Sequence, residues 1–227
     1  MAQLISGLSA QRIRENVARV REQIDAARRL APQRAVDAPA QVELLAAIKY
    51  VAADDLPLLA EAGISLVGEN RAQELIAKHA AHGELFEWDF IGQLQSRRVR
   101  EIVPCARLIH SVASESALRE LARHRESARA GLRILIEVNV AGEPGKAGVA
   151  PEQLGAFIER SPVPVAGLMT MPPLAAAPQD SRRWFAALRK LADEHALEHL
   201  SMGTSQDYVV AVEQGATIVR IGTRLYD

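Results

Sequence analysis

The sequence predicts a single TIM-like (β/α)8 barrel with an extra helix at its N-terminus. Eight short apolar runs alternate with helical patterns along most of the chain, as in βαβ units that build a parallel sheet. Several runs are apolar throughout, which is typical of parallel strands covered on both faces. The count of eight, and the lack of a glycine-rich dinucleotide fingerprint after the first run, favour a closed barrel over an open doubly wound sheet.

The first expected element is an amphipathic helix over residues 9–30. Its apolar residues recur at helical spacing, with Arg and Glu between them: Ile13, Val17, Val20 and Ile24. A loop rich in proline and alanine follows over residues 31–41. We assign residues 1–40 to the N-terminal helix and loop and residues 42–227 to the barrel. No shift in composition marks a boundary, so residues 1–227 are expected to form one domain.

The eight expected strands follow in order. They are VELLAAIKY (42–50), ISLVGEN (64–70), WDFIGQLQ (88–95), RLIHSVAS (107–114), RILIEVNV (133–140), VAGLMTM (165–171), HLSMGTS (199–205) and TIVRIGT (217–223). Each of the first seven is followed by a stretch with a helical pattern, such as DLPLLAEAG (55–63) after the first and SRRWFAALRKLADEHA (181–196) after the sixth. At 227 residues the chain is slightly shorter than the roughly 250 residues usual for this barrel, so short loops are expected.

Composition excludes several classes of protein. The 27 Lys and Arg residues nearly balance the 28 Asp and Glu residues, so neither nucleic acid nor an anionic membrane is an expected partner. Cys105 is the one cysteine, which excludes an internal disulfide and fits a reducing cytoplasm. The N-terminus lacks the features of a signal peptide, and no apolar run approaches the about 20 residues that span a bilayer. We therefore expect a cytoplasmic protein.

The first run ends in Lys49, a candidate Schiff-base lysine. Active sites of such barrels lie at the carboxyl ends of the strands, and alternation along the run places Lys49 on one face with Glu43, Leu45 and Ala47. If that face lines the barrel, the side chain lies at the mouth, where partial desolvation favours the nucleophilic neutral amine. The alternative is a lysine that extends from the strand end into solvent.

The seventh and eighth strands end in loops suited to a phosphate group. Barrels of this class often hold a phosphate between these two loops and a helix N-terminus. Gly203 and Gly222 allow close approach of the backbone, and Ser205 and Thr223 offer hydroxyl groups. A helix expected after Ser205 would direct its first amides at the ligand, although Ser205 also fits a simple helix N-cap.

Arg220 lies within the apolar eighth strand, three residues before Thr223. A buried arginine needs an acceptor. One candidate is a pyridine nitrogen, since an arginine partner to that atom is a known arrangement in pyridoxal enzymes. The other candidate is an ion pair inside the barrel with Glu43 or another carboxylate.

Eight stretches, in this order and spacing, resemble the YggS/PROSC family of pyridoxal phosphate homeostasis proteins over nearly the whole chain. They are AAIKY, GENRAQE, FIGQLQ, IHSVAS, EVNVAGEPGKAG, GLMTMPP, LSMGTSQD and VRIGT. The resemblance implies a barrel like the N-terminal domain of bacterial alanine racemase. It implies pyridoxal 5′-phosphate (PLP) as cofactor and a role in intracellular PLP homeostasis and delivery, with PLP-dependent apoenzymes as candidate recipients. It also implies a monomer.

The resemblance assigns roles to individual residues. Lys49 would carry the internal aldimine, and Arg220 would face the pyridine nitrogen. The remaining expected cofactor contacts are Ser205, Gly222 and Thr223 at the phosphate, with Asn70, Met202 and Gly203 close by. For Asn70 the spacing to Gln73 also predicts a helix capping box, which would explain this residue without a ligand.

The sequence departs from the common family pattern at the barrel rim and at its end. The departures are Arg97, Arg98, Ala113 and Thr204, and a chain that stops at Asp227 where relatives usually continue. The expected cofactor site is left intact by these changes. They concern whatever function the rim or a tail serves.

Residue chemistry favours a binding protein over an enzyme. A guanidinium stays protonated, so Arg220 would keep the ring nitrogen unprotonated and the cofactor a poor electron sink. Racemase relatives take a second acid/base from a further domain, which we do not expect here. Tyr50 should point away from Lys49, and Tyr208 and Tyr226 should serve packing. The alternative is a weak amino-acid racemase or transaminase of the same fold.

Overall fold

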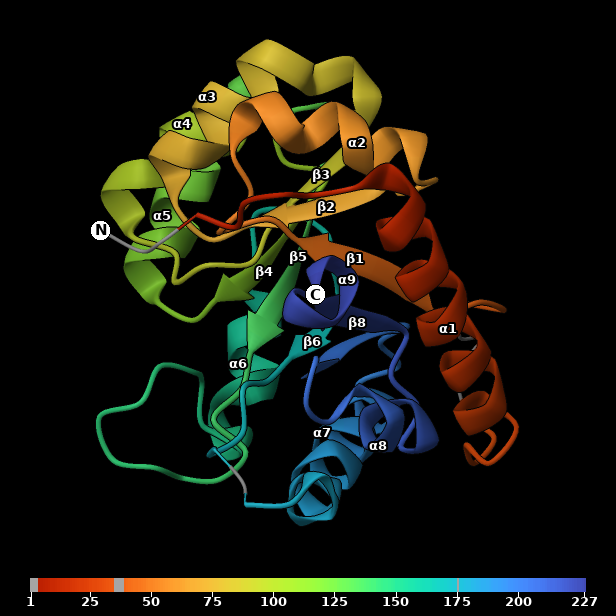
Figure 1. The fold of residues 1–227 in the computed structure, drawn as a ribbon. Helices are drawn as coiled ribbons and strands as arrows, with labels where there is room; N and C mark the ends of the chain where they lie inside the picture. Colours follow the sequence, from red (N-terminus) through yellow and green to blue (C-terminus); the bar gives the residue numbers. More distant parts are fainter. Residues whose placement is uncertain (1–3, 35–38, 175) are drawn as a thin grey trace.

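The computed structural model describes residues 4–34, 39–174 and 176–227, within which eight parallel strands form a closed barrel (Figure 1). The strands are β1 (Glu43–Ala47), β2 (Leu66–Glu69), β3 (Glu87–Phe90), β4 (Leu108–Val112), β5 (Arg133–Glu137), β6 (Val165–Met169), β7 (His199–Thr204) and β8 (Ile218–Ile221). Each strand pairs with the next along the chain, and β8 pairs with β1 to close the ring, with Arg220 opposite Leu45. The predicted (β/α)8 fold is confirmed. Most strands end earlier than the apolar runs do.

Helices connect the strands and surround the barrel (Figure 1). They are α1 (Ala10–Arg28), α2 (Leu56–Glu61), α3 (Ala72–His82), α4 (Val99–Ile102), α5 (Glu115–Arg123), α6 (Leu154–Glu159), α7 (Arg182–Glu194), α8 (Tyr208–Glu213) and α9 (Thr223–Tyr226). Several follow a short 3₁₀ turn, as α4 follows residues 96–98. None of the helices in the described ranges is long and apolar enough to cross a membrane.

The predicted N-terminal helix is present as α1. Its buried face contains the residues that the periodicity indicated, Ile13, Val17, Val20 and Ile24. This face packs against α8 and α9. The buried Asn16 amide donates to the carbonyl oxygens of Leu225 at 3.2 Å and Asp227 at 2.9 Å. Helix α1 therefore fixes α9, the segment that follows the eighth strand.

Apolar side chains form two cores because residues alternate between the two faces of each strand. The smaller core fills the inside of the barrel and contains Leu45, Leu66, Leu108, Leu135, Ala166, Met169 and Ile218. The larger core lies between the strands and the surrounding helices. Leu45 in the inner core confirms that the face of β1 shared by Glu43, Leu45 and Ala47 lines the barrel. Lys49 follows this face at the end where the strands terminate.

An ion cluster closes the opposite, N-terminal end of the barrel. Arg107 donates to both carboxylate oxygens of Glu43, at 2.8 and 2.9 Å, and to Asp89 at 2.7 Å. Asp89 is fully buried. Burial by itself would raise the Asp89 pKa, but hydrogen bonds from His110 and Arg107 hold that pKa below its usual value. One guanidinium thus binds both carboxylates at this end, and His110 binds Asp89 as well.

Candidate functional site

The loops after β7 and β8 meet at the barrel mouth. The backbone amide of Gly222 donates to Ser205 Oγ at 3.1 Å, and Arg224 Nε donates to the Ser205 carbonyl at 2.9 Å. The structure therefore brings together the two loops that the sequence proposed as a phosphate site. Thr223 begins α9 beside them and is exposed.

Ser205 does not cap a helix. Helix α8 begins at Tyr208, with Asp207 at the N-cap position, so the N-cap explanation of Ser205 is wrong. Asp207 turns its carboxylate back toward Thr204 and accepts from the Thr204 amide at 2.8 Å. The Ser205 hydroxyl, in contrast, is directed at the neighbouring loop through Gly222.

The two glycines of the mouth differ in what surrounds them. A Cβ atom on Gly203 would lie 2.6 Å from Ala211 Cβ, and Gly203 has a φ of +91°, so this glycine is required by packing against α8. A Cβ atom on Gly222 would meet only Ala47, at 3.7 Å or more. A methyl group at Gly222 would therefore lie in ordinary contact with the end of β1, so packing alone does not require a glycine at this position.

Lys49 lies in the turn just beyond β1, and its side chain is exposed. Its Nζ atom lies 4.6 Å from the centre of the Tyr50 ring. The prediction that Tyr50 points away from Lys49 is wrong, because β1 ends at Ala47 and the alternation of a strand no longer applies in the turn. The exposure of Lys49 fits both a Schiff-base role and a solvent-facing lysine, so its role stays a prediction.

Asn70 follows β2, which pairs with β1 on the side opposite to β8. The capping-box explanation is wrong, because Arg71 is the N-cap residue of α3 and makes no capping bond with its side chain. Asn70 Oδ1 is buried and has no hydrogen-bond partner among the described residues. A buried amide oxygen without a donor is uncommon and calls for an explanation. A ligand group in the mouth that donates a hydrogen bond would supply one.

Arg220 is buried inside the barrel, and its guanidinium donates to neutral groups. Nη1 donates to Ser201 Oγ at 2.5 Å, and Nη2 donates to the Thr170 carbonyl at 3.1 Å and contacts Met171 Sδ at 2.9 Å. The proposed ion pair with Glu43 is wrong, since Glu43 pairs with Arg107 at the far end. Burial lowers the Arg220 pKa to about 10, so Arg220 is still a cation at neutral pH.

A chain of buried polar side chains behind Arg220 was not predicted from the sequence. His110 Nδ1 lies 2.8 Å from Ser201 Oγ, and His110 Nε2 lies 3.1 Å from Asp89 Oδ2. Burial lowers the His110 pKa. A neutral His110 that donates through Nε2 to Asp89 leaves Nδ1 to accept from Ser201, whose oxygen then accepts from Arg220. These side chains thus orient Arg220 through the Ser201 hydroxyl, while the Asp89 carboxylate lies beyond His110.

Glu137, at the end of β5, is a second mouth residue that the sequence did not single out. Its side chain is buried, and burial raises its pKa, while the positive charges of Arg220 and Lys146 act in the opposite direction. Glu137 is followed by Val138 and Asn139, and the Asn139 side chain closes its own loop by donating to the Glu143 carbonyl at 2.9 Å.

Met202 is not brought to the mouth by its side chain. It is fully buried in the outer core, between the strands and the helices. The expected contact of Met202 with the cofactor stays a prediction that only its backbone could satisfy. Alternation along β7 explains the position, because Ser201 faces inward.

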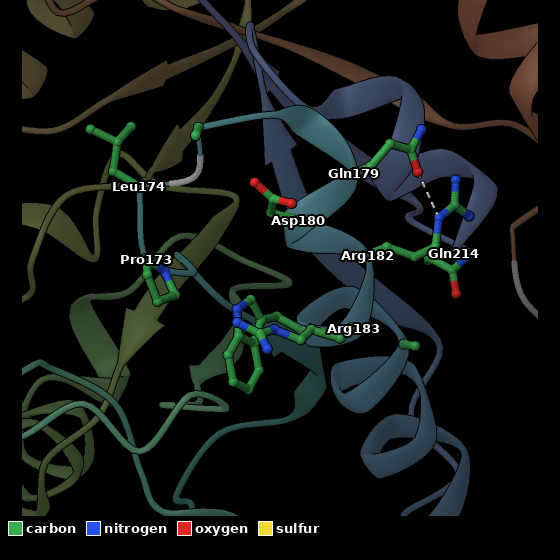
Figure 2. Close-up of a pocket in the computed structure, with 10 residues that line it drawn as sticks. Pro173, Leu174, Gln179, Asp180, Arg182, Arg183 and Gln214 are labelled. Carbon is green, nitrogen blue, oxygen red and sulfur yellow. Dashed lines mark hydrogen bonds between the residues drawn. The ribbon is translucent and has the colours of Figure 1, made fainter.

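Two cavities lie along the loop after β6. One, of about 620 Å³, is lined by Arg220, Gly203 and the Pro172–Pro173 segment, and therefore adjoins the mouth. The other, of about 730 Å³, lies over the start of α7, where Arg182 donates to Gln179 at 2.9 Å (Figure 2). The second cavity contains none of the predicted cofactor residues among those that line it.

Comparison with known proteins adds evidence of a different kind. The family model described as "Alanine racemase, N-terminal domain" matches residues 8–227. A protein of Aquifex aeolicus named pyridoxal phosphate homeostasis protein is 42% identical over 195 residues, which cover 81% of this chain and 86% of that protein. A protein of the same name from Pseudomonas aeruginosa is 38% identical and covers 94% of both chains.

Solved structures show the same architecture. PipY of Synechococcus elongatus, solved with PLP bound, has a TM-score of 0.77 and 31% identity, covering 95% of this chain and all of that chain. A protein of Bifidobacterium adolescentis has a TM-score of 0.84 and 29% identity, with 99% and 98% covered. Alanine racemase from Corynebacterium glutamicum has a TM-score of 0.66 at 13% identity, and this chain covers 63% of it, so that likeness concerns the fold alone.

Proposed function

The chain belongs to the alanine racemase N-terminal domain family and to its pyridoxal phosphate homeostasis proteins, and from this membership we propose that it binds PLP and acts in PLP homeostasis rather than as an enzyme. The observation that carries the proposal is the junction of the β7 and β8 loops. Ser205 and Gly222 meet there beside the end of β1. A phosphate site next to a lysine-bearing turn is what PLP requires.

The residues of the mouth suit the parts of the cofactor. Ser205, Gly222 and Thr223 would hold the phosphate through hydroxyl and amide groups. Arg220 would donate to the pyridine nitrogen, and Asn70 would use its buried Oδ1 to accept from a donor group. PLP supplies an aldehyde. The amine of Lys49 would add to the aldehyde carbon, and the aldehyde oxygen would leave as water when the C=N bond forms.

Arg220 is the residue that disfavours catalysis. Its pKa of about 10 leaves it protonated at neutral pH, so it can only donate to the ring nitrogen. A ring nitrogen that carries no proton withdraws electrons weakly from a bound amino acid. An arginine partner would therefore leave the bound cofactor a weaker electron sink, which disfavours racemisation and transamination.

A spectroscopic titration tests the proposal. We expect PLP to give the absorption band of a protonated Schiff base, and borohydride to fix the cofactor covalently on Lys49. Lys49→Ala should abolish both the band and the trapped adduct. An adduct that peptide mapping places on another lysine, or a Lys49→Ala variant that keeps the band, would overturn the assignment.

The alternative of a weak racemase or transaminase is tested with the same preparation. Alanine is added in deuterated water, and exchange of its α-proton is followed by NMR. We expect exchange far slower than enzymes of this fold achieve. Exchange at rates typical of enzymes would identify a catalyst.

The remaining expectations concern the surroundings of the protein in the cell. We propose that it is a cytoplasmic monomer and that it passes PLP to apoenzymes. Light scattering tests the monomer. Transfer is tested by mixing the PLP-loaded protein with a PLP-dependent apoenzyme and a scavenger of free PLP. Activation of the apoenzyme despite the scavenger supports delivery, and activation only without the scavenger contradicts it.

A further inference from the structure

A buried ion pair, Glu69 with Lys78, joins the two segments that present Lys49 and Asn70. The Glu69 and Lys78 side chains are 0% and 3% exposed. Lys78 Nζ lies 2.7 Å from Glu69 Oε2 and donates to the Ile48 carbonyl at 2.9 Å. The other carboxylate oxygen, Glu69 Oε1, accepts from the Asn70 amide at 2.7 Å. The Glu69–Lys78 pair thus bonds to the backbone at Ile48, just after β1, and at Asn70, just after β2.

The peptide before Lys49 is fixed by this pair. The Ile48 amide donates to the Gly68 carbonyl at 3.0 Å, and the Ile48 side chain is fully buried. Its carbonyl accepts from Lys78 and from the Val51 amide, which closes the turn at 3.0 Å. Beyond the end of β1, pairing with β2 holds the Ile48 amide, and the Val51 amide and the Lys78 ammonium together hold the Ile48 carbonyl.

The turn that presents Asn70 is fixed from the other end of the pair. Glu69 Oε1 also lies 3.4 Å from the Arg71 amide, at the N-cap of α3. The carboxylate therefore binds the two amides that follow it in the chain. In this arrangement Asn70 Oδ1 is buried and has no hydrogen-bond partner within residues 4–34, 39–174 and 176–227.

Stability alone does not explain such a pair, because a buried ion pair is often no more stabilising than apolar residues of the same size. We propose that Glu69 and Lys78 are positioning residues that hold Lys49 and Asn70 in register across the mouth, and so set how fast Lys49 reacts with the PLP aldehyde. The inference rests on the proposed function. It also assigns the two lysines different tasks, since the Lys78 amine is occupied by a carboxylate and a carbonyl.

The test replaces the pair as a unit. A single Lys78→Met change leaves the buried Glu69 carboxylate without its cation and can unfold the protein, so the informative variant is Glu69→Leu/Lys78→Met. Its matched control is Arg34→Met/Asp193→Leu. Arg34 likewise joins a carboxylate, at 2.9 Å, to a backbone carbonyl, that of Leu197 at 2.8 Å, but lies near the N-terminal end of the barrel.

Two rates are measured for the parent and for both variants, each at the same interval below its own melting temperature. The first is the rate at which PLP forms the borohydride-trappable adduct on Lys49, which we expect to fall at least tenfold in the Glu69/Lys78 variant and to stay within twofold in the control. The second needs no cofactor: it is the rate at which an amine-specific acylating reagent labels Lys49, measured by mass spectrometry. We expect this rate to change in the first variant only.

The outcomes separate the two proposals. If the parent protein forms no adduct on Lys49, the proposed function fails, while the labelling rates still decide whether the pair positions Lys49. If the parent forms the adduct and the Glu69/Lys78 variant matches it in both rates, the positioning role is overturned. Equal losses in the variant and the control would likewise overturn it, since they would reflect general destabilisation.

Discussion

Alanine substitutions at two glycines of the barrel mouth, Gly203 and Gly222, distinguish an effect on packing from an effect on cofactor binding. A Cβ atom at Gly222 would meet only Ala47, 3.7 Å from its carbonyl oxygen and 3.8 Å from its Cβ, which is ordinary contact. A Cβ atom at Gly203 would lie 2.6 Å from Ala211 Cβ and 2.9 Å from Tyr208 Cα, at a φ of +91°. A methyl group is accommodated at the first position and excluded at the second.

The expected magnitudes differ accordingly. In Gly203→Ala the positive φ costs about 1–3 kcal/mol, and the overpacking against α8 adds about 1–3 kcal/mol. In Gly222→Ala the loss of stability should be smaller than in Gly203→Ala, because the added Cβ atom would meet only Ala47, at 3.7 Å or more. There the methyl group occupies the space through which a phosphate would reach the loop. Loss of one hydrogen bond to a charged group costs about 1.5–3 kcal/mol, or about 10–150-fold in Kd.

Denaturant unfolding of the protein without cofactor and PLP titration of each variant test this reasoning. Gly203→Ala should unfold at a clearly lower denaturant concentration. Gly222→Ala should unfold at a concentration closer to that of the parent but bind PLP more weakly. A Gly222→Ala variant with parental affinity would refute the placement of the phosphate. A Gly203→Ala variant with parental stability would refute the packing argument.

Three further predictions concern the remaining mouth residues and His110, which lies behind Arg220. Ser205→Ala and Thr223→Ala should each weaken PLP binding by about 1.5–3 kcal/mol; a double variant that binds PLP as tightly as the parent, and no more weakly than it binds unphosphorylated pyridoxal, would contradict this. Arg220→Glu should let the ring nitrogen hold a proton and raise the rate of α-proton exchange. Because Glu137 lies near this position, circular dichroism must first show that the variant is folded. If the parent is already active and the variant exchanges more slowly, the protein is a catalyst. Burial lowers the His110 pKa, so the unfolded chain binds this proton first as pH falls below about 6.5, and stability should decline by up to about 1.4 kcal/mol per pH unit. His110→Asn should flatten that decline in denaturant titrations, and an unchanged slope would exclude His110 as its source.

Local patterns were sufficient to place the eight strands, the helices between them and the mouth, but not the ends of the strands. Apolar runs and helical periodicity depend on which face of an element is buried, and this information is contained in neighbouring residues. The inward direction of Leu45 and the buried face of α1 both follow from such periodicity. The same alternation misplaced Tyr50, because the sequence does not show that β1 ends at Ala47 rather than at Lys49.

Short motifs predicted local hydrogen bonds less well. Ser205 fitted an N-cap and Asn70 fitted a capping box. In the structure Ser205 accepts from the Gly222 amide of another loop, and the buried Asn70 oxygen has no partner in the part of the chain that the structure describes. A polar side chain in a loop can bond to the backbone of its own turn or to that of another loop. Which of these is available depends on where the neighbouring strand end lies, and this is a property of the closed ring.

The sequence by itself determined the barrel, the segment that carries Lys49 and the two loops at Gly203 and Gly222, because each of these depends on residues that are contiguous in the chain. The tertiary structure alone decided the partners of the buried charges. Arg220 is 19 residues from Ser201, and Ser201 is 91 residues from His110, yet their side chains form one chain through the barrel. Closing eight strands into a ring brings side chains from opposite strands into a volume without bulk water, where every polar group must find a partner from whichever strand faces it.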